Sequence, residues 1–175
     1  MTTSSSLPEK AEDKLALGLE QASQVSLRVE IEDVSLVESV IRQRLIQKRL
    51  PPNIWFGTGT KTEVQKLDSG KQPSWRIVVL IRFELVGKYP DMEPGEERIR
   101  IEASFRLTYR LDSIEGLDEE NFRAFGELNG IYNAYPYWRE YLQSTITRMG
   151  LPPLIAPLFK PKAEVAARSA SAKNG

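Results

Sequence analysis

Hydrophobic and polar residues alternate most regularly over residues 97–111 (ERIRIEASFRLTYRL). From Ile99 to Leu111 every second side chain is apolar or aromatic, and the side chains between them are charged or carry a hydroxyl group. This period of two residues indicates a β-strand with one buried and one solvated face. A slip of one residue would exchange the two faces, so the register of this strand is well specified.

Three other segments have the pattern of strands. Apolar residues alternate from Val25 to Ile31, and residues 53–67 are rich in threonine and aromatic residues. Residues 74–86 are apolar on much of both faces, which is typical of a central strand. The continuation of the first segment over residues 34–50 fits either a strand or a helix. Its apolar positions at helical spacing are Val37, Ile41 and Leu45.

Two helices are expected after the strands. Residues 117–132 have helical apolar spacing and an acidic first turn, which suits the helix dipole. This helix is expected to end near Asn133, because the residue before a proline avoids the α conformation. The next helix is expected to begin at Pro136 and to stop at Gly150. The order predicts an α+β fold, a four-stranded antiparallel sheet with two C-terminal helices on one face.

The segment after the last helix, residues 151–159 (LPPLIAPLF), combines five large apolar side chains with three prolines. Loops that face water are normally built from small and polar residues, so this composition is unusual for a solvated loop. A folded domain must either bury such a segment or use it to contact something apolar.

The length of 175 residues corresponds to one domain with tails. Residues 1–24 are rich in Ser, Thr, Glu and Lys and are expected to form a disordered N-terminal tail. Residues 160–175 are small and basic and are expected to form a disordered C-terminal tail. The folded domain is therefore predicted to span residues 25–159.

Composition excludes several classes of function. Lys plus Arg equals Asp plus Glu, at 24 each, so no overall field favours nucleic acid or an anionic membrane. The chain has no cysteine and no histidine, which argues against thiolate metal sites, a cysteine nucleophile and a histidine base. No apolar run is long enough to span a membrane, and the N-terminus lacks a signal peptide. We expect a cytoplasmic, non-enzymatic protein without cofactor or metal.

The C-terminal third resembles the SecB export chaperones. The resemblance lies in an ordered set of residues: Pro136-Tyr137-x-Arg139-Glu140, Ser144, Ile146, Arg148, Gly150, Leu151-Pro152-x-Leu154 and Ala156-Pro157. It favours a strand through at least Val40 and leaves residues 38–50 undecided between strand and helix. It also implies a homotetramer built as a dimer of dimers, and a chaperone that binds unfolded or precursor polypeptides without ATP, with a role in export.

By position, the resemblance implies that apolar residues of the tail and of the second strand contact clients. These residues are Leu151, Leu154, Ile155, Leu158, Ile54 and Phe56. Each of them also fits a place in the hydrophobic core. The alternative function is a dedicated adaptor or antitoxin-type chaperone of the same fold, which serves one specific partner and has no export role.

Docking on the ATPase motor of the preprotein translocase is a separate implication of the resemblance. It assigns this contact to acidic residues of the first strand, and Asp33 occupies one such position. The next expected position is Val37, and Glu38 follows one residue later, where it is expected to point to the other face of the strand. The sequence therefore favours polypeptide binding over an export role.

Overall fold

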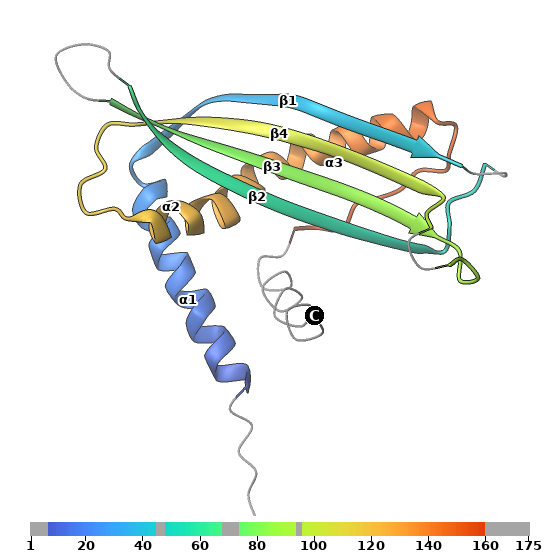
Figure 1. Cartoon of the computed structure of the whole chain (residues 1–175), viewed down its shortest axis with the longest axis horizontal. Coiled ribbons are helices and arrows are strands. Elements are labelled where there is room, and N and C mark those ends of the chain that lie inside the picture. Colours follow the sequence, from blue (N-terminus) through green and yellow to red (C-terminus); the bar gives the residue numbers. More distant parts are fainter. Residues whose placement is uncertain (1–6, 45–47, 68–73, 94–95, 160–175) are drawn as a thin grey trace, which may run out of the picture.

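The computed structural model describes residues 7–44, 48–67, 74–93 and 96–159. Four antiparallel strands, β1 (Val29–Gln43), β2 (Asn53–Leu67), β3 (Ser74–Lys88) and β4 (Ile99–Leu111), form one sheet in the order β1-β4-β3-β2. A long helix, α3 (Ile131–Arg148), lies along one side of this sheet (Figure 1). The predicted α+β fold with a four-stranded antiparallel sheet is confirmed.

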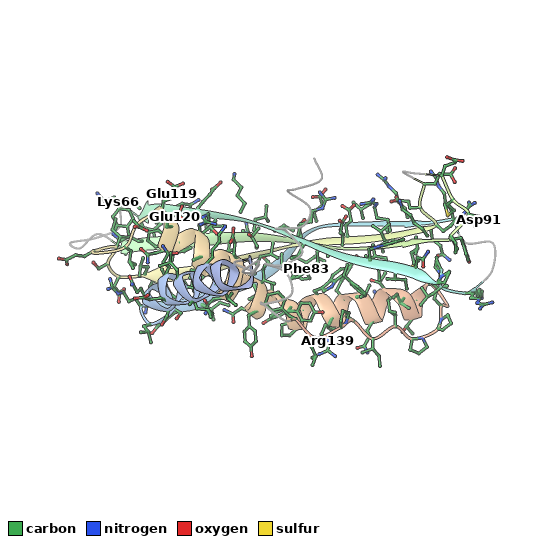
Figure 2. The ribbon with its side chains drawn as sticks, turned by 90° about the horizontal axis from the view of Figure 1, so that it is seen from below. Lys66, Phe83, Asp91, Glu119, Glu120 and Arg139 are labelled. Atoms are coloured by element: carbon green, nitrogen blue, oxygen red, sulfur yellow. The ribbon has the colours of Figure 1, made fainter. Side chains whose placement is uncertain are left out.

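The two central strands, β3 and β4, carry most of the core. Their inward side chains, from Ile77 to Leu85 and from Ile99 to Leu111, are almost completely buried, as the alternation predicted. Trp138 of α3 stacks on Phe83 with ring centroids 5.5 Å apart. Figure 2 shows Phe83 between the sheet and α3, whereas Arg139 points away from the sheet. We call the face under the helices the inner face and the opposite one the outer face.

The helical region after β4 is one continuous run with a change of pitch. It consists of α2 (Glu119–Phe125), a π-helical turn η1 (Gly126–Gly130), and α3. Asp118 starts α2 with a capping box, in which Asp118 and Asn121 each accept the other's backbone N–H at 3.0 Å. A β-carbon at Gly126 would overlap Thr62 Oγ1, so glycine allows η1 to sit directly on β2.

The predicted break between the helices, at Asn133–Pro136, was wrong. Pro136 lies inside α3 and is exposed, so it does not form the first turn of a new helix. Buried residues continue along the inner face of the helix on both sides of it, at Ile131, Ala134 and Trp138. Burial of this face stabilises the helix by more than the hydrogen bond that proline removes.

The N-terminal region also differs from the prediction. Helix α1 (Leu7–Ser26) occupies most of the stretch that was expected to be a disordered tail over residues 1–24. Ala22 and Val25 are buried, and the side-chain amide of Asn121 donates to the Gln21 carbonyl at 3.3 Å. Of the α1 side chains that the structure describes, those of residues 14–26, only Ala22 and Val25 are buried, so the sequence of α1 resembles that of a solvated segment. The predicted tail over residues 160–175 lies outside the described residues.

The first strand begins four residues later than predicted, because Val25 belongs to α1 and the strand starts at Val29. The segment that the sequence left undecided is strand as far as Gln43. Its pairing with β4 shifts register twice, between Ile31 and Asp33 and between Leu36 and Glu38. Each shift inserts an extra residue opposite a regular strand, which is the geometry of a β-bulge.

Candidate functional site: the apolar tail and the edge strands

The apolar tail starts at a well-defined helix stop. Gly150 has φ +68, as predicted for the residue after a helix end, and its N–H donates to the Thr147 carbonyl at 3.0 Å. The Leu151 N–H donates to the Ile146 carbonyl at 3.2 Å. This pair of bonds is a Schellman motif, and its hydrophobic contact explains why Leu151 is only 6% exposed.

The far end of the tail is held by an aromatic side chain of α3. The Tyr135 hydroxyl donates to the Pro157 carbonyl, and the rings of Tyr135 and Phe159 lie 5.8 Å apart. The ring of Tyr135 also packs against the ring of Phe83, with the ring centroids 5.9 Å apart. Figure 1 shows the tail returning from the end of α3 on the side of the helix nearer to β2. Residues 151–159 are therefore anchored at both ends.

Between these anchors the tail presents two side chains to solvent. Ile155 is 76% exposed and Leu158 is 69% exposed, whereas Leu154 is half-buried and Ala156 is buried. Exposed large aliphatic side chains on a fixed backbone are unfavourable in water unless they bind something. The structure thus divides the predicted tail residues into two that face outward, Ile155 and Leu158, and two that pack on the domain, Leu151 and Leu154.

The two candidates on β2 lie on the inner face of the sheet. Ile54 and Phe56 pair with Gly87 and Leu85, respectively, of β3. Phe56 is 39% exposed because it lies on the edge strand, and Ile54 is half-buried against the core. We define the β2-side strip as the apolar residues Ile54, Phe56, Leu154, Ile155 and Leu158.

Strand β2 changes character along its inner face. After Phe56 the next inward positions are Thr58, Thr60 and Thr62. Thr58 pairs with Phe83, the residue that Tyr135 contacts, so the anchored end of the tail lies near this change from apolar to hydroxyl side chains. The alternation in residues 53–67 predicted this change along β2, but no local pattern predicted that Tyr135 would anchor the tail beside it.

A second apolar surface on the inner face was missed. Ile31, Leu36 and Ile41 of β1 pair with inward residues of β4, yet each is close to half exposed. Tyr137 of α3 is also exposed. Its ring centroid lies 6.5 Å from that of Phe105, the β4 residue that pairs with Leu36. We call these four residues the β1-side strip. The two bulges interrupt the strict alternation of apolar and polar residues in β1. The apolar residues then recur at a spacing that also fits a helix, which is why the sequence left residues 34–50 undecided between strand and helix.

The outer face of the sheet carries ion pairs together with a few exposed apolar side chains, such as Trp55 and Leu80. Arg76 pairs with Glu32 at 3.2 Å, Arg110 with Glu30 at 2.6 Å, and Arg100 with Glu84 at 2.9 Å. These pairs are partly solvated, so each contributes little to the stability of the fold.

Glu102 lies within this charged network. Partial burial alone would raise the pKa of its carboxyl group, but hydrogen bonds and charges from Arg100 and Arg82 hold that pKa below its usual range. Glu102 therefore remains a charged partner for both arginines at neutral pH.

The two acidic residues predicted to dock the translocase motor lie on this outer face. Asp33 pairs with Thr108 and Glu38 with Ser104, two outward positions of β4. The expectation that Glu38 points to the other face was wrong. The bulge at Val37 adds one residue to β1, so Glu38 points to the same face as Asp33. Within the described residues, neither carboxylate makes an ion pair or a side-chain hydrogen bond.

Comparison with solved structures identifies the architecture. The chain is similar to the Mycobacterium tuberculosis SecB-like chaperone Rv1957, solved in complex with a ChAD peptide from the Rv1956 HigA1 antitoxin. The TM-score is 0.55 at 17% identity, and the match covers 81% of this chain and 97% of that chain. This chain has a SecB-like fold.

The resemblance predicted from residues 136–157 is thus confirmed for the fold. No protein-family model and no curated protein matches the sequence. No helix among the described residues is long and apolar enough to cross a membrane.

Proposed function

We propose that this protein is an ATP-independent chaperone that binds unfolded or precursor polypeptides on the β2-side strip. The observation that carries the proposal is the pair of outward side chains, Ile155 and Leu158, on a tail anchored at both ends. An aliphatic and aromatic surface of this kind binds apolar segments of many sequences, because it makes no fixed polar contacts that would select one. Strand β2 lies at the edge of the described sheet, a position at which an extended chain can add backbone hydrogen bonds.

The similar solved structure supports polypeptide binding, since Rv1957 is described in complex with a peptide. That peptide comes from an antitoxin, which also favours the second candidate, a dedicated adaptor or antitoxin-type chaperone with one specific partner. The two functions differ in selectivity. A general chaperone binds unrelated unfolded chains with similar affinity, whereas a dedicated adaptor binds its partner and leaves other unfolded chains free.

Suppression of aggregation tests the proposal. A slow-folding precursor and two unrelated unfolded proteins are diluted from denaturant with and without the chain, in the absence of ATP, and light scattering is recorded. We expect suppression of all three at stoichiometric concentrations. Lack of suppression together with lack of binding would contradict chaperone function, and suppression of one protein alone would favour the dedicated adaptor.

We further propose that the chain assembles as a homotetramer, a dimer of dimers. The support is the β1-side strip together with the outer edge of β1, which pairs with no other described strand. Unpaired edges and exposed apolar strips are the features that a second copy covers. Light scattering should give a native mass of roughly four times the 19.9 kDa chain, and a monomer would contradict the assembly.

For an export role, we propose that Asp33 and Glu38 form a docking site for the translocase motor ATPase and that the protein acts in the cytoplasm. The support is their position on one face of β1, where both carboxylates are exposed. Asp33→Asn/Glu38→Gln should lower affinity for the motor at least tenfold in a pull-down titration. Glu30→Gln, which removes a carboxylate already paired with Arg110, is the control. Equal effects would argue against this docking site.

A further inference from the structure

A pocket on the outer face of the sheet is lined almost entirely by charged side chains. It lies where β1 ends and β4 begins, at the end of the sheet opposite α2 (Figure 1), and its volume is about 590 Å³. Its described lining consists of one aliphatic residue, Val40, together with three glutamates and five arginines. None of the residues proposed above to bind clients or to dock the translocase motor lines this pocket.

Four of the arginines form a compact group across two paired strands. Arg42 of β1 pairs with Arg100 of β4, and beyond this pair the Arg44 N–H donates to the Arg98 carbonyl at 2.8 Å. The group lies on the outer face, and Ile99, between Arg98 and Arg100, is buried on the inner face. Opposite residues of an antiparallel pair have β-carbons about 5 Å apart, and alternate residues of one strand are about 7 Å apart. A small ligand can therefore reach several of these guanidinium groups at once.

Carboxylates of the domain neutralise one member of this group. Arg100 makes ion pairs of 2.6–2.9 Å with three of them: Glu97, Glu102 and Glu84. Glu102 is also the partner of Arg82, the fifth arginine of the lining. Two of the five arginines, and two of the three glutamates that line the pocket, are thus already paired with one another.

The remaining arginines have no carboxylate within ion-pair or hydrogen-bond distance among the described residues: Arg42, Arg44 and Arg98. Residues 45–47 and 94–95, which adjoin the pocket residues in the sequence, contain no acidic residue. Against these three arginines the lining offers one further carboxylate, Glu96, so positive charge is in excess. Like charges placed opposite each other on paired strands repel, and an anion bound between them relieves that repulsion.

The composition of the lining indicates the chemical class of the anion. With no aromatic side chain among the described lining residues, the pocket offers a nucleobase no stacking surface, and Val40 alone offers little to an apolar group. Guanidinium groups bind phosphate and carboxylate oxygens through paired hydrogen bonds. The glutamates in the same wall repel any anion, so a high density of negative charge is needed to overcome them. A phosphate group has more charge and more acceptor oxygens than a single carboxylate.

We propose that this pocket binds a ligand with two or three linked phosphate groups, held by Arg42, Arg44 and Arg98. Inorganic tripolyphosphate and the phosphate chain of a nucleoside triphosphate share this chemistry, and the base of a nucleotide stays in water. The β2-side strip lies on the inner face, so the phosphate ligand and a client bind to opposite faces of the sheet. Binding involves no hydrolysis and is compatible with a chaperone that works without ATP.

Isothermal titration calorimetry of the full-length protein with tripolyphosphate tests the proposal. The ionic strength is held constant with NaCl, because salt screens attraction between partly solvated charges. Arg42→Gln/Arg44→Gln removes two of the unpaired guanidinium groups. Arg76→Gln/Arg110→Gln is the matched control, because it removes the same charge from the same face but takes arginines that already have carboxylate partners. Circular dichroism checks that both variants are folded.

We expect one tripolyphosphate per chain, with affinity at least tenfold lower in Arg42→Gln/Arg44→Gln and changed less than twofold in the control. Equal losses in the two variants, or no binding by the original chain, would overturn the proposal. The same titrations with ATP in the absence of magnesium, with adenosine and with a hexaglutamate peptide identify the part of the ligand that is bound.

ATP should bind within threefold of tripolyphosphate, and adenosine should not bind. A larger difference in favour of ATP, or binding of adenosine, would overturn the assignment to the phosphate chain. Binding of the hexaglutamate peptide as tight as that of tripolyphosphate would overturn it in favour of an acidic peptide. No client is present in these titrations, so their result is separate from the test of the proposed function.

Discussion

The inner face of the sheet carries large apolar side chains both at its centre and at its two edges, but they are buried at the centre and partly exposed at the edges. On the inner face of β3 and β4, large apolar residues are covered by α2, η1 and α3, with Tyr109 against Phe125 and Trp138 stacked on Phe83. On the same face of β1 and β2, residues such as Leu36 and Phe56 remain partly exposed. One helix is too narrow to cover four strands, since its diameter with side chains is about 10–12 Å and neighbouring strands are spaced about 4.8 Å apart.

This difference separates stability from function. The centre is a buried hydrophobic core, and its contacts stabilise the folded chain. The edges are apolar surfaces, and covering them with a client or with a second copy is favourable. Substitutions at the centre should therefore change the free energy of unfolding, and substitutions at the edges should change binding or assembly.

The largest effect is expected at the centre. Trp138→Ala removes a buried indole from its stack on Phe83 and should lower the free energy of unfolding by about 3–5 kcal/mol. The neighbouring, exposed Tyr137→Ala should lower it by about 1 kcal/mol or less. Urea denaturation of both variants measures the contrast. Similar losses would mean that α3 is not packed with Trp138 inward.

A second effect at the centre depends on pH. Burial raises the pKa of Tyr109 to about 12, an effect that a hydrogen bond from Asn133 only partly offsets. The phenol of an unfolded chain has a pKa of about 10. The contribution of the neutral phenol is complete below pH 10 and is lost as the pH rises from about 10 through about 12. The loss amounts to roughly 2–3 kcal/mol.

Denaturation between pH 8 and pH 11.5 checks this prediction. Tyr109→Phe has no phenol to ionise, so its free energy of unfolding should decline less steeply above pH 10 than that of the original chain. Parallel curves for the two proteins would show that Tyr109 is not buried as described.

The tail tests the boundary between centre and edge. Leu154→Asp places a charge among residues that pack on the core and should lower the free energy of unfolding by about 1–3 kcal/mol. Leu158→Asp lies on the exposed side, and the change should stay within about 0.5 kcal/mol. Thermal unfolding of the two variants gives the comparison. Equal destabilisation would assign Leu158 to the core and remove it from the β2-side strip.

The smallest effect on the folded chain is expected at β1. Leu36→Ser/Ile41→Ser should change the stability of the isolated chain by about 0.5 kcal/mol, because both side chains are already near half exposed. The same change should reduce the native mass measured by light scattering. A native mass equal to that of the original chain would show that the β1-side strip is not an assembly surface.

The centre could be predicted from the sequence, and the edges could not. Strict alternation between Ile99 and Leu111 predicted both the strand and its buried face, since burial on one side imposes a period of two. The stop at Gly150 was predicted because only a few residues favour its positive φ. These signals are local, and each one is complete within a few residues.

The failures were matters of tertiary packing. Val25 alternates with its neighbours as a strand residue would, yet it is buried in a helix against the domain. Pro136 continues a helix because the buried side of α3 extends past it. The bulge at Val37 turned Glu38 to the outer face. For the tail, sequence predicted an apolar segment, but only the Tyr135 contacts distinguish the outward Ile155 and Leu158 from their packed neighbours.

The most direct test of the proposed function is the affinity of an unfolded client for a variant changed only at the exposed edge. Binding of a permanently unfolded, fluorescently labelled protein is titrated without ATP against the original chain and against Ile155→Asp/Leu158→Asp. We predict at least a tenfold loss of affinity, with the urea midpoint and native mass unchanged. Equal affinity for the two proteins, with both folded, would contradict the claim that the β2-side strip binds clients.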